Sequence, residues 1–595
     1  MCGILGGVGV DLEVASLDRA LAAMGHRGPD GEGRFRGGGV FLGHRRLAII
    51  DTSAAADQPM TIAGCGTLVF NGEIYDFRRH RELLEAEGIR FETDSDTEVL
   101  LRGLARHGVA FLPRLHGMYA FAWLDDTGRR LMLARDHAGM KPLYLARTHG
   151  GLLFASEVRT LATLMRAAGV PVRTSAAALA AFLGWGCVPE PHTVLDGVEM
   201  LPAASTLEID ARTGAVLARA PVQTAPAAEG LEPALRAATL RHLVADHPVA
   251  LFLSGGIDSG VLAVEMARWA SAPPTAISVA LRSRGTDDEP DLVRRLTRRL
   301  GMRLHLVELD DWRQRLRGAL DAYDQPSIDG LNTFVISGVA RELGFKVALS
   351  GVGADEVFGG YSNLRARALP AGPLWRRLPG VPLAARLLDR TLSPKLRRAA
   401  ALLEGAKDGA RPQRSYRRVY TRARVAELIP GGREPTALHE DGDVMALERA
   451  TYLRDMLLRD TDVMSMAHGV EVRAPYLDPA VLAVGASFGG ELLRRDKPPK
   501  WVLREAFRDA LGEQAAGRAK TGFTLDVAGW LRDDGRDLLE DARLGVMRSG
   551  LVEPGAFAAE WSRCVAALSR RHPAAWVRAF AWVQVHRQVE RWGAP

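Results

Sequence analysis

The hydrophobic pattern changes character between about residues 205 and 233 of this 595-residue chain, and that change constrains the fold most. Residues 1–205 alternate short apolar runs, such as 68–70 and 119–124, with turn signals such as Asn-Gly and Asp-Asp-Thr-Gly. From about residue 233, amphipathic stretches alternate with short buried runs such as 249–253. The first pattern predicts a β-rich α/β domain, and the second predicts a parallel sheet flanked by helices.

The length alone requires more than one domain, since a single hydrophobic core stops growing beyond roughly 250–300 residues. We expect a first domain over residues 1–210 and a second over 233–595. Residues 211–232 are rich in Ala, Thr, Pro and Gly without clear periodicity, which is typical of a linker. Within the second domain we expect 364–450 and 450–595 to be mostly helical.

The composition argues against several classes of protein. No apolar run reaches the roughly 18 residues of a membrane span, and the first residues lack the basic flank of a signal peptide. Four cysteines without Cys-x-x-Cys spacing favour a reducing, cytoplasmic location over a disulfide framework. The net charge of +6 comes largely from arginines between 365 and 424. No nucleic-acid-binding motif accompanies them, so we expect a solvated helical face there.

Cys2 is the first candidate for catalysis. If Met1 is removed, one residue carries both a thiol and a free α-amino group, whose pKa is about 7.7–8.0. The amine can then accept the thiol proton directly or through one water, which gives a self-contained nucleophile and base. The alternative is that position 2 is simply a small residue that favours removal of Met1.

Four short motifs share the first hundred residues with Cys2, and each lies at the end of an expected strand or helix, where sites are built. They are His-Arg-Gly-Pro-Asp-Gly at 26–31, Gly-His-Arg-Arg-Leu-Ala-Ile-Ile-Asp at 43–51, Asn-Gly-Glu-Ile-Tyr at 71–75 and Asp-Ser-Asp-Thr-Glu at 94–98. In this order and spacing they resemble the class II, N-terminal-nucleophile (Ntn) glutamine amidotransferase domain of the asparagine synthetase family.

This resemblance implies a four-layer αββα Ntn sandwich in which Cys2 attacks the side-chain amide of glutamine, forms a thioester and releases ammonia. It implies that the Asn71 amide and the Gly72 N–H form the oxyanion hole, a role that suits fixed neutral donors. A guanidinium suits the α-carboxylate of glutamine, and carboxylates suit its α-ammonium group. The residues that the resemblance assigns to glutamine binding are Arg46, Asn71, Glu73 and Asp96.

A second site is expected where Ser254-Gly255-Gly256-Ile257-Asp258-Ser259 follows a buried run and opens a helix. Small residues let backbone N–H groups surround a phosphate, and the helix N-terminus adds its positive end. The spacing is not that of a Walker A loop, because no Gly-Lys-Ser/Thr closes it. A plain glycine turn is the alternative. The motif matches the PP-loop of ATP pyrophosphatases, which cleave ATP between its α and β phosphates.

Further motifs follow at 349–361, 462–467, 471–478 and 499–504. With the PP-loop, they resemble the synthetase domain of the asparagine synthetase family, a parallel-sheet, adenine-nucleotide α-hydrolase-like fold that here carries added helices. The resemblance implies ATP as co-substrate. The residues that it assigns to ATP are Leu253, Ser254, Gly255, Gly256, Asp258, Ser259, Val279, Ser350 and Gly351.

Two carboxylates and one lysine complete the expected second site. Asp258 and Asp355 are candidates to hold Mg²⁺, since hard cations on phosphates favour carboxylates. The resemblance places Lys500 on the phosphates or on the reaction intermediate, and the alternative is an exposed helix lysine.

Together the two resemblances predict a glutamine-dependent amidotransferase. It would convert ATP, a carboxylic acid, glutamine and water into AMP, pyrophosphate, an amide and glutamate, with aspartate as the default acceptor. One residue departs from the family pattern. Val352 stands where well-matched asparagine synthetases have a glutamate near the acceptor, and valine can neither hydrogen-bond nor bind an ammonium group.

Two alternatives to this function stay open. The first is the same chemistry on another carboxylic acid, in a polysaccharide or secondary-metabolite pathway. The second is a catalytically dead scaffold or nitrogen sensor. Separately from the function, the sequence is compatible with a homodimer.

Overall fold

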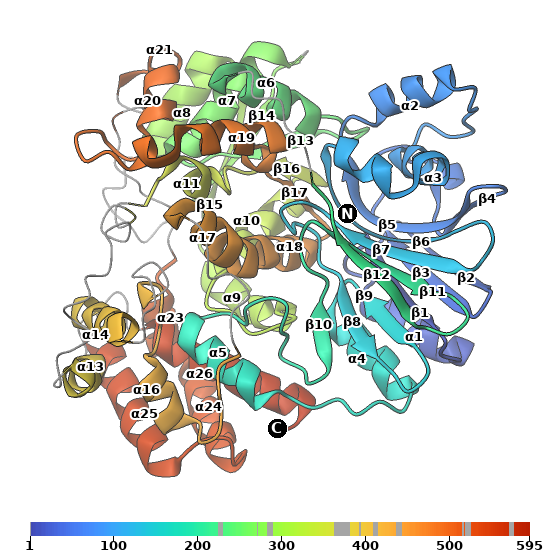
Figure 1. Cartoon of the computed structure of the whole chain (residues 1–595). Coiled ribbons are helices and arrows are strands. Elements are labelled where there is room, and N and C mark those ends of the chain that lie inside the picture. Colours follow the sequence, from blue (N-terminus) through green and yellow to red (C-terminus); the bar gives the residue numbers. More distant parts are fainter. Residues whose placement is uncertain are drawn as a thin grey trace.

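The computed structural model describes most of the chain. Its N-terminal part, which ends with β12 at Pro221 and is called the first half below, is a sandwich of two antiparallel sheets between helices (Figure 1). The part from Leu231 onward is called the second half. The described residues are 2–223, 230–270, 272–281, 289–361, 364, 381–391, 394–407, 415–435, 443–513, 517, 525–570 and 576–595.

The two sheets of the sandwich have six strands each. The first has the order β10-β8-β9-β1-β3-β2, with β10 Val198–Met200, β8 Tyr144–Arg147, β9 Leu152–Ala155, β1 Gly3–Val8, β3 Val40–Arg46 and β2 Gly31–Gly37. The second has the order β12-β11-β7-β6-β5-β4, with β12 Val216–Pro221, β11 Ser205–Asp210, β7 Arg130–Arg135, β6 Gly117–Leu124, β5 Gly66–Ile74 and β4 Met60–Ile62.

Alternation along the strands produces the layers. Ile4 and Leu42 point into the core between the sheets, where they pack with Val69 of the second sheet. Their neighbours Leu5 and Phe41 point the other way, into the core beneath the helices. This is the two-residue period of a strand buried on both faces.

Helices cover both outer faces and complete the αββα order expected of the first half. The first sheet is covered by two helices, α1 Val14–Ala23 and α4 Val158–Ala167. The second sheet is covered by α3 Asp96–His107, and α2 Phe77–Ala86 packs against α3. The expected fold class of this half is therefore confirmed.

The second half is built on a five-stranded parallel sheet of order β15-β14-β13-β16-β17. Its strands are β15 Arg303–Leu309, β14 Thr275–Leu281, β13 Val249–Phe252, β16 Val347–Leu349 and β17 Glu471–Arg473. The flanking helices are α6 Leu231–His242, α7 Ile257–Trp269, α8 Glu289–Leu300, α9 Trp312–Ala322, α10 Leu331–Glu342 and α18 Arg459–Met466 (Figure 1). The predicted parallel sheet with helices is confirmed.

The rest of the second half is mainly helical. Helices near the synthetase loops are α11 Ala354–Phe358, α17 Val444–Glu448, the π-helix η4 Arg449–Leu458, α19 Pro479–Phe488 and α20 Trp501–Ala506. A further group gathers at the lower left of Figure 1: α13 Val381–Asp389, α14 Pro394–Lys407, α16 Arg422–Leu428, α23 Val527–Asp533, α24 Arg536–Arg548, α25 Pro554–Ser569 and α26 Trp576–Trp592. No described helix is long and apolar enough to cross a membrane.

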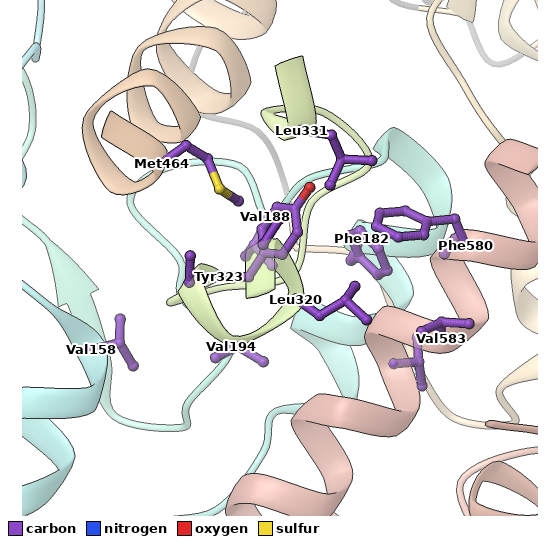
Figure 2. Close-up of a cluster of buried hydrophobic side chains, with 14 of the residues drawn as sticks. Val158, Phe182, Val188, Val194, Leu320, Tyr323, Leu331, Met464, Phe580 and Val583 are labelled. Carbon is purple, nitrogen blue, oxygen red and sulfur yellow. The ribbon is translucent and has the colours of Figure 1, made fainter. Parts of the chain in front are cut away.

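An apolar seam joins the two halves, as Figure 2 shows. Phe182 of α5 (Ala176–Trp185) and Val194 come from the first half, and Leu320 and Tyr323 come from α9 and the turn after it. Phe580 of α26 packs into the same cluster. Because such a seam removes apolar surface from water along its whole length, it stabilises one arrangement of the two halves.

Part of the segment 211–232, which the composition predicts to be a linker, forms a strand. Strand β12 lies within 211–232 and pairs with β11, with Ser205 opposite Pro221. Helix α6 begins at Leu231. The Ala- and Thr-rich composition hid an edge strand, whose side chains are mostly exposed and so lack an alternating apolar pattern.

Candidate active site

Cys2 lies buried directly before β1, beside β5 of the facing sheet. Its backbone nitrogen donates to Oδ1 of Asn71 at 3.0 Å, and its sulfur lies 4.0 Å from the carbonyl oxygen of Leu47. Burial raises the pKa of the Cys2 thiol, while the positive charge at the chain's N-terminus opposes that rise. The thiol therefore needs a nearby base to become a nucleophile.

Asn71 and Gly72 sit side by side in β5, next to Cys2. Because Oδ1 of Asn71 is bound by Cys2, only its Nδ2 amide remains, and this atom is buried without an acceptor among the described residues. A Cβ at Gly72 would lie 2.0 Å from the carbonyl oxygen of Met118, so only glycine fits there. An uncommitted buried donor is costly, and its place beside a thiol suits a developing oxyanion.

Arg46 ends β3 on the same side of the sandwich and is buried. Its guanidinium donates to the carbonyl oxygens of Ser53 and Asp51, and at 2.7 Å to Oδ1 of Asp57. These acceptors fix the plane of the guanidinium, which is what a carboxylate clamp requires.

Glu73 and Asp96 lie in a buried acidic cluster that includes residues from the second half of the chain. Oδ2 of Asp96 accepts the N–H of Ile74 at 2.9 Å. Burial raises the pKa of Asp96 to about 7, and burial together with Glu471 and Asp96 raises the pKa of Glu73 well above its usual value. The cluster therefore holds more carboxylate than its surroundings can neutralise.

Arg473 is the cation of this cluster, and it comes from β17 of the parallel sheet. It is fully buried and lies 3.6 Å from Oε1 of Glu73. It also donates to the carbonyl oxygens of His242 and Val244 at 2.8 and 2.7 Å. Despite burial, Arg473 holds the pKa of Glu471 below its usual range. The sequence motif at 471–478 gave no sign that β17 reaches the first site.

Arg27 makes a second connection between the halves. Its Nε donates to the carbonyl oxygen of Cys2 at 3.1 Å, and its Nη2 pairs with Oδ2 of Asp462 at 2.8 Å. Lys141 also reaches Asp462, at 3.3 Å. Both motifs, at 26–31 and 462–467, are visible in the sequence, but their contact is not.

The PP-loop joins β13 to α7, as expected. Ser254 and Ser259 bond each other through their hydroxyls at 3.1 Å, and the Ser259 hydroxyl also accepts the N–H of Ser254 at 3.1 Å. Gly256 is the N-cap of α7 and has extended backbone angles. The loop thus opens at a helix N-terminus, where backbone N–H groups bind anions.

The other residues assigned to ATP surround this loop. Leu253 directly follows β13, Val279 lies in the neighbouring β14, and Ser350 and Gly351 follow β16 on the other side of β13. A Cβ at Gly351 would lie 2.9 Å from Cβ of Asp258, so the two loops touch closely. The carboxyl ends of three adjacent parallel strands therefore meet here, which is where open α/β sheets bind their ligands.

Lys500 joins the two carboxylates of the second site. Its Nζ lies 2.5 Å from an oxygen of Asp258 and 2.5 Å from one of Asp355. Burial would lower the pKa of Lys500, but the two carboxylates raise it above its usual value. A Cβ at Gly360 would lie 1.7 Å from Oδ1 of Asp355, so the absence of a side chain there makes room for the cluster.

The backbone at Lys500 is strained. The residue is buried and has φ of 56°, in the left-handed region that residues with a Cβ rarely adopt. Such strain persists where the surroundings over-determine it, and it concentrates at functional sites. The interpretation as an exposed helix lysine does not fit this position, because Lys500 is buried and precedes α20.

The two carboxylates fit a divalent cation, since their oxygens converge on one ammonium group. Among the described residues, no group of three or more His, Cys, Asp and Glu side chains could hold a metal. A cation at Asp258 and Asp355 would therefore take its remaining ligands from phosphate oxygens, as Mg²⁺ does in nucleotide sites.

Comparison with known proteins agrees with this arrangement. A family model described as glutamine amidotransferase domain matches residues 1–218, and one described as asparagine synthase matches residues 230–592. The putative glutamine-hydrolyzing asparagine synthetase of Mycobacterium tuberculosis is 31% identical and covers 89% of this chain and 88% of its own length.

Two further relatives extend the comparison. Glutamine-hydrolyzing asparagine synthetase 1 of Bacillus subtilis is 29% identical, over 86% of this chain and 83% of its own length. Amidase chyE of Penicillium rubens is 29% identical, over 60% of this chain and 56% of its own length. The chain belongs to the asparagine synthetase family of glutamine-hydrolysing ligases.

Proposed function

We propose that this ligase hydrolyses glutamine at Cys2 and uses ATP at the PP-loop to activate a carboxylic acid. The ammonia released from glutamine would then convert the activated acid into an amide. The observation that carries the proposal is the Lys500 cluster at the carboxyl edge of the parallel sheet. A buried, strained lysine between two aspartates, beside a phosphate loop, suits the cleavage of ATP between its α and β phosphates.

In the first site, the Cys2 sulfur would attack the side-chain carbonyl of glutamine. The free Nδ2 of Asn71 and the N–H of Gly72 would bind the oxyanion, and the thioester would form as ammonia leaves. Arg46 would bind the α-carboxylate. Asp96 and Glu73 would bind the α-ammonium group, whose positive charge offsets the surplus of buried carboxylate.

In the second site, the Ser254–Ser259 loop would bind the pyrophosphate part of ATP, and Leu253, Val279, Ser350 and Gly351 would line the nucleotide pocket. Mg²⁺ held by Asp258 and Asp355 would supply charge for the pyrophosphate oxygens. Lys500 would place its ammonium group on the phosphates and stabilise charge that develops as the bond to pyrophosphate breaks.

The acceptor is aspartate by default, and Val352 favours a different carboxylic acid. Val352 is half-buried and packs against the apolar core of the second half. An ammonium group placed against it would lose hydration without gaining a partner. The relative from Penicillium rubens, matched over 60% of the chain, is named an amidase and not an asparagine synthetase, which supports the first alternative, the same chemistry on another carboxylic acid.

We also propose that the glutaminase domain extends to Pro221 and that the synthetase domain begins at Leu231. The pairing of β12 with β11 and the start of α6 support these boundaries.

Steady-state pyrophosphate release with ATP, ammonium and candidate acids tests the function. Release with any carboxylic acid supports it, and turnover of about 1 s⁻¹ or more with aspartate would identify aspartate as the substrate. If neither pyrophosphate release nor glutaminase activity is seen, the chain is a dead scaffold. Glutaminase activity without release from a broad panel would contradict the second half of the proposal only.

A further inference from the structure

A cavity of about 360 Å³ lies among α5, α14, η4 and α26, and none of its lining residues belongs to the sites described above. Its volume is within the range of small-molecule pockets, roughly 300–1,000 Å³. The aromatic residues that line the cavity are Trp185, Tyr416, Tyr452 and Trp576. Helices α14 and α26 of its wall lie in the lower left of Figure 1, away from α7 at the top, which the PP-loop opens.

The cavity is also lined by arginines, and most of them are already paired. Three guanidinium groups bind carboxylates of their own and so form a fixed wall. The pairs are Arg417 with Glu448, Arg418 with Glu434, and Arg578 with both Asp389 and Glu560.

Two further arginines of the wall, Arg397 and Arg398, have no carboxylate partner among the described residues. Arg397 is half-buried, and burial together with Arg578 lowers its pKa. Asp389, whose charge reaches Arg397, is bound by Arg578 instead. Among the described residues, Arg398 donates to the hydroxyl of Tyr416 at 3.4 Å, and its guanidinium lies 5.2 Å from the centre of the same ring.

A half-buried cation without an acceptor costs stability. Asp329 also lines the wall, where it accepts the N–H of Gly330 at 2.7 Å and the hydroxyl of Tyr452 at 3.5 Å. Proteins keep a cost such as that of the half-buried Arg397 guanidinium mainly at functional sites, where a bound ligand can offset it.

We propose that this cavity binds an organic anion, whose carboxylate or phosphate group pairs with Arg397 and Arg398 and whose aromatic or apolar body lies against Trp185 and Trp576. Planar guanidinium groups bind both kinds of anion through paired hydrogen bonds. Indole rings offer flat apolar surface for the body of the ligand.

The cavity is connected to the candidate ATP site through its wall. The Arg417 guanidinium lies 3.4 Å from the ring centre of Tyr452 and 4.6 Å from that of Tyr361. The Tyr361 hydroxyl donates to Oε1 of Glu356 at 2.6 Å, and Glu356 follows Asp355 in α11. The anion could therefore be the far end of the acceptor acid or a separate effector.

Binding of small fluorinated probes to the full chain, followed by ¹⁹F NMR, tests the proposal without requiring activity. The probes are 4-fluorobenzoate and 4-fluorophenyl phosphate, with neutral 4-fluorobenzamide as the matched control. At least one anion should bind saturably, and the amide should bind more weakly. Arg397→Gln should weaken anion binding about tenfold or more, because a charge-assisted pair is lost. Arg548→Gln, which removes an exposed arginine of α24, should leave it unchanged.

Thermal unfolding of the ligand-free variants provides the second measurement. Arg397→Gln should unfold at a higher temperature than the parent chain, because it removes an unpaired half-buried charge. This rise also shows that weaker binding does not come from misfolding. Arg397→Lys, which keeps the charge, should retain part of the affinity.

Steady-state kinetics then distinguishes the two sources of the anion. If the anion is part of the acceptor, Arg397→Gln raises the KM of an acid with a second anionic group and leaves the KM of ATP unchanged. If it is an effector, a probe changes the rate without being consumed. The proposal is overturned if neither anion binds saturably at millimolar concentration, if the amide binds as tightly as the anions, or if Arg397→Gln and Arg548→Gln bind the anions equally well.

Discussion

Replacing Lys500 by Met tests the core of the proposed ATP site. The substitution keeps the length of the side chain but leaves Asp258 and Asp355 facing each other without the shared ammonium group. Removing one partner of a buried ion pair costs about 3–5 kcal/mol. The side chains of Lys500, Asp258 and Asp355 are 4, 22 and 12% exposed, so water screens their charges to some extent. We therefore expect a loss near the lower end, about 3 kcal/mol, in the free energy of unfolding by urea.

The same variant should lose activity in one half only. Pyrophosphate release should fall about a hundredfold to a thousandfold, the usual effect of removing one preorganised charge, while glutaminase activity continues. Mg²⁺ should restore part of the lost stability in Lys500→Met and have little effect on the parent chain, since a divalent cation would replace the missing charge between the carboxylates.

Lys497→Met is the matched control. Lys497 pairs with Glu505 at 2.6 Å on the surface, and exposed pairs contribute at most about 1 kcal/mol. The reasoning would be refuted if Lys500→Met behaved like this control, with stability within about 1 kcal/mol of the parent chain and pyrophosphate release within about tenfold.

Three further predictions concern other residues. Cys2→Ala should abolish glutamine-dependent amide formation while ammonium-dependent formation persists, and residual glutaminase turnover would rule out Cys2 as the nucleophile. Gly360→Ala should lower pyrophosphate release at least about tenfold, because the new Cβ would lie 1.7 Å from Oδ1 of Asp355; normal release would mean that the loop moves freely. Burial raises the pKa of Asp96 to about 7, above the value of about 3.9 in an unfolded chain, so its contribution to stability is complete below about pH 4 and is lost as pH rises through 7. Asp96→Asn should therefore unfold at a temperature that falls less between about pH 5 and about pH 8 than that of the parent chain, and an equal fall would contradict the assignment.

Local patterns in the sequence were sufficient to predict the two kinds of sheet and the position of the PP-loop. Neighbouring residues such as Ile4 and Leu5 pack into two different cores, one on each face of β1. A continuous apolar run near the N-terminus is therefore compatible with a strand. A buried run followed by small residues and a helix fixes Ser254 at the carboxyl end of β13. Exposed β12 has no such pattern, so its pairing could not be predicted from composition.

The first site shows why chemistry can be harder to predict than fold. Cys2, Asn71 and Arg46 are close in space because β1, β5 and β3 belong to one sandwich, and their motifs follow one another in sequence. Arg473 and Glu471 are about four hundred residues further along the chain and reach the same site only because β17 is the edge strand of the parallel sheet. No local pattern encodes that contact.

The contact has a physical consequence for how the two halves depend on each other. Burial and the charge of Glu471 raise the pKa of Glu73 and Asp96, and Arg473 is the cation from the opposite half that limits this rise. Arg473 is in turn held in place by the carbonyl oxygens of His242 and Val244, at the end of α6 and just after it. The synthetase half thus supplies both Glu471, whose charge raises the pKa of Glu73 and Asp96, and Arg473, whose charge lowers it, so a first half expressed alone would keep its Cys2 but lose both groups that set the charge balance of the glutamine site.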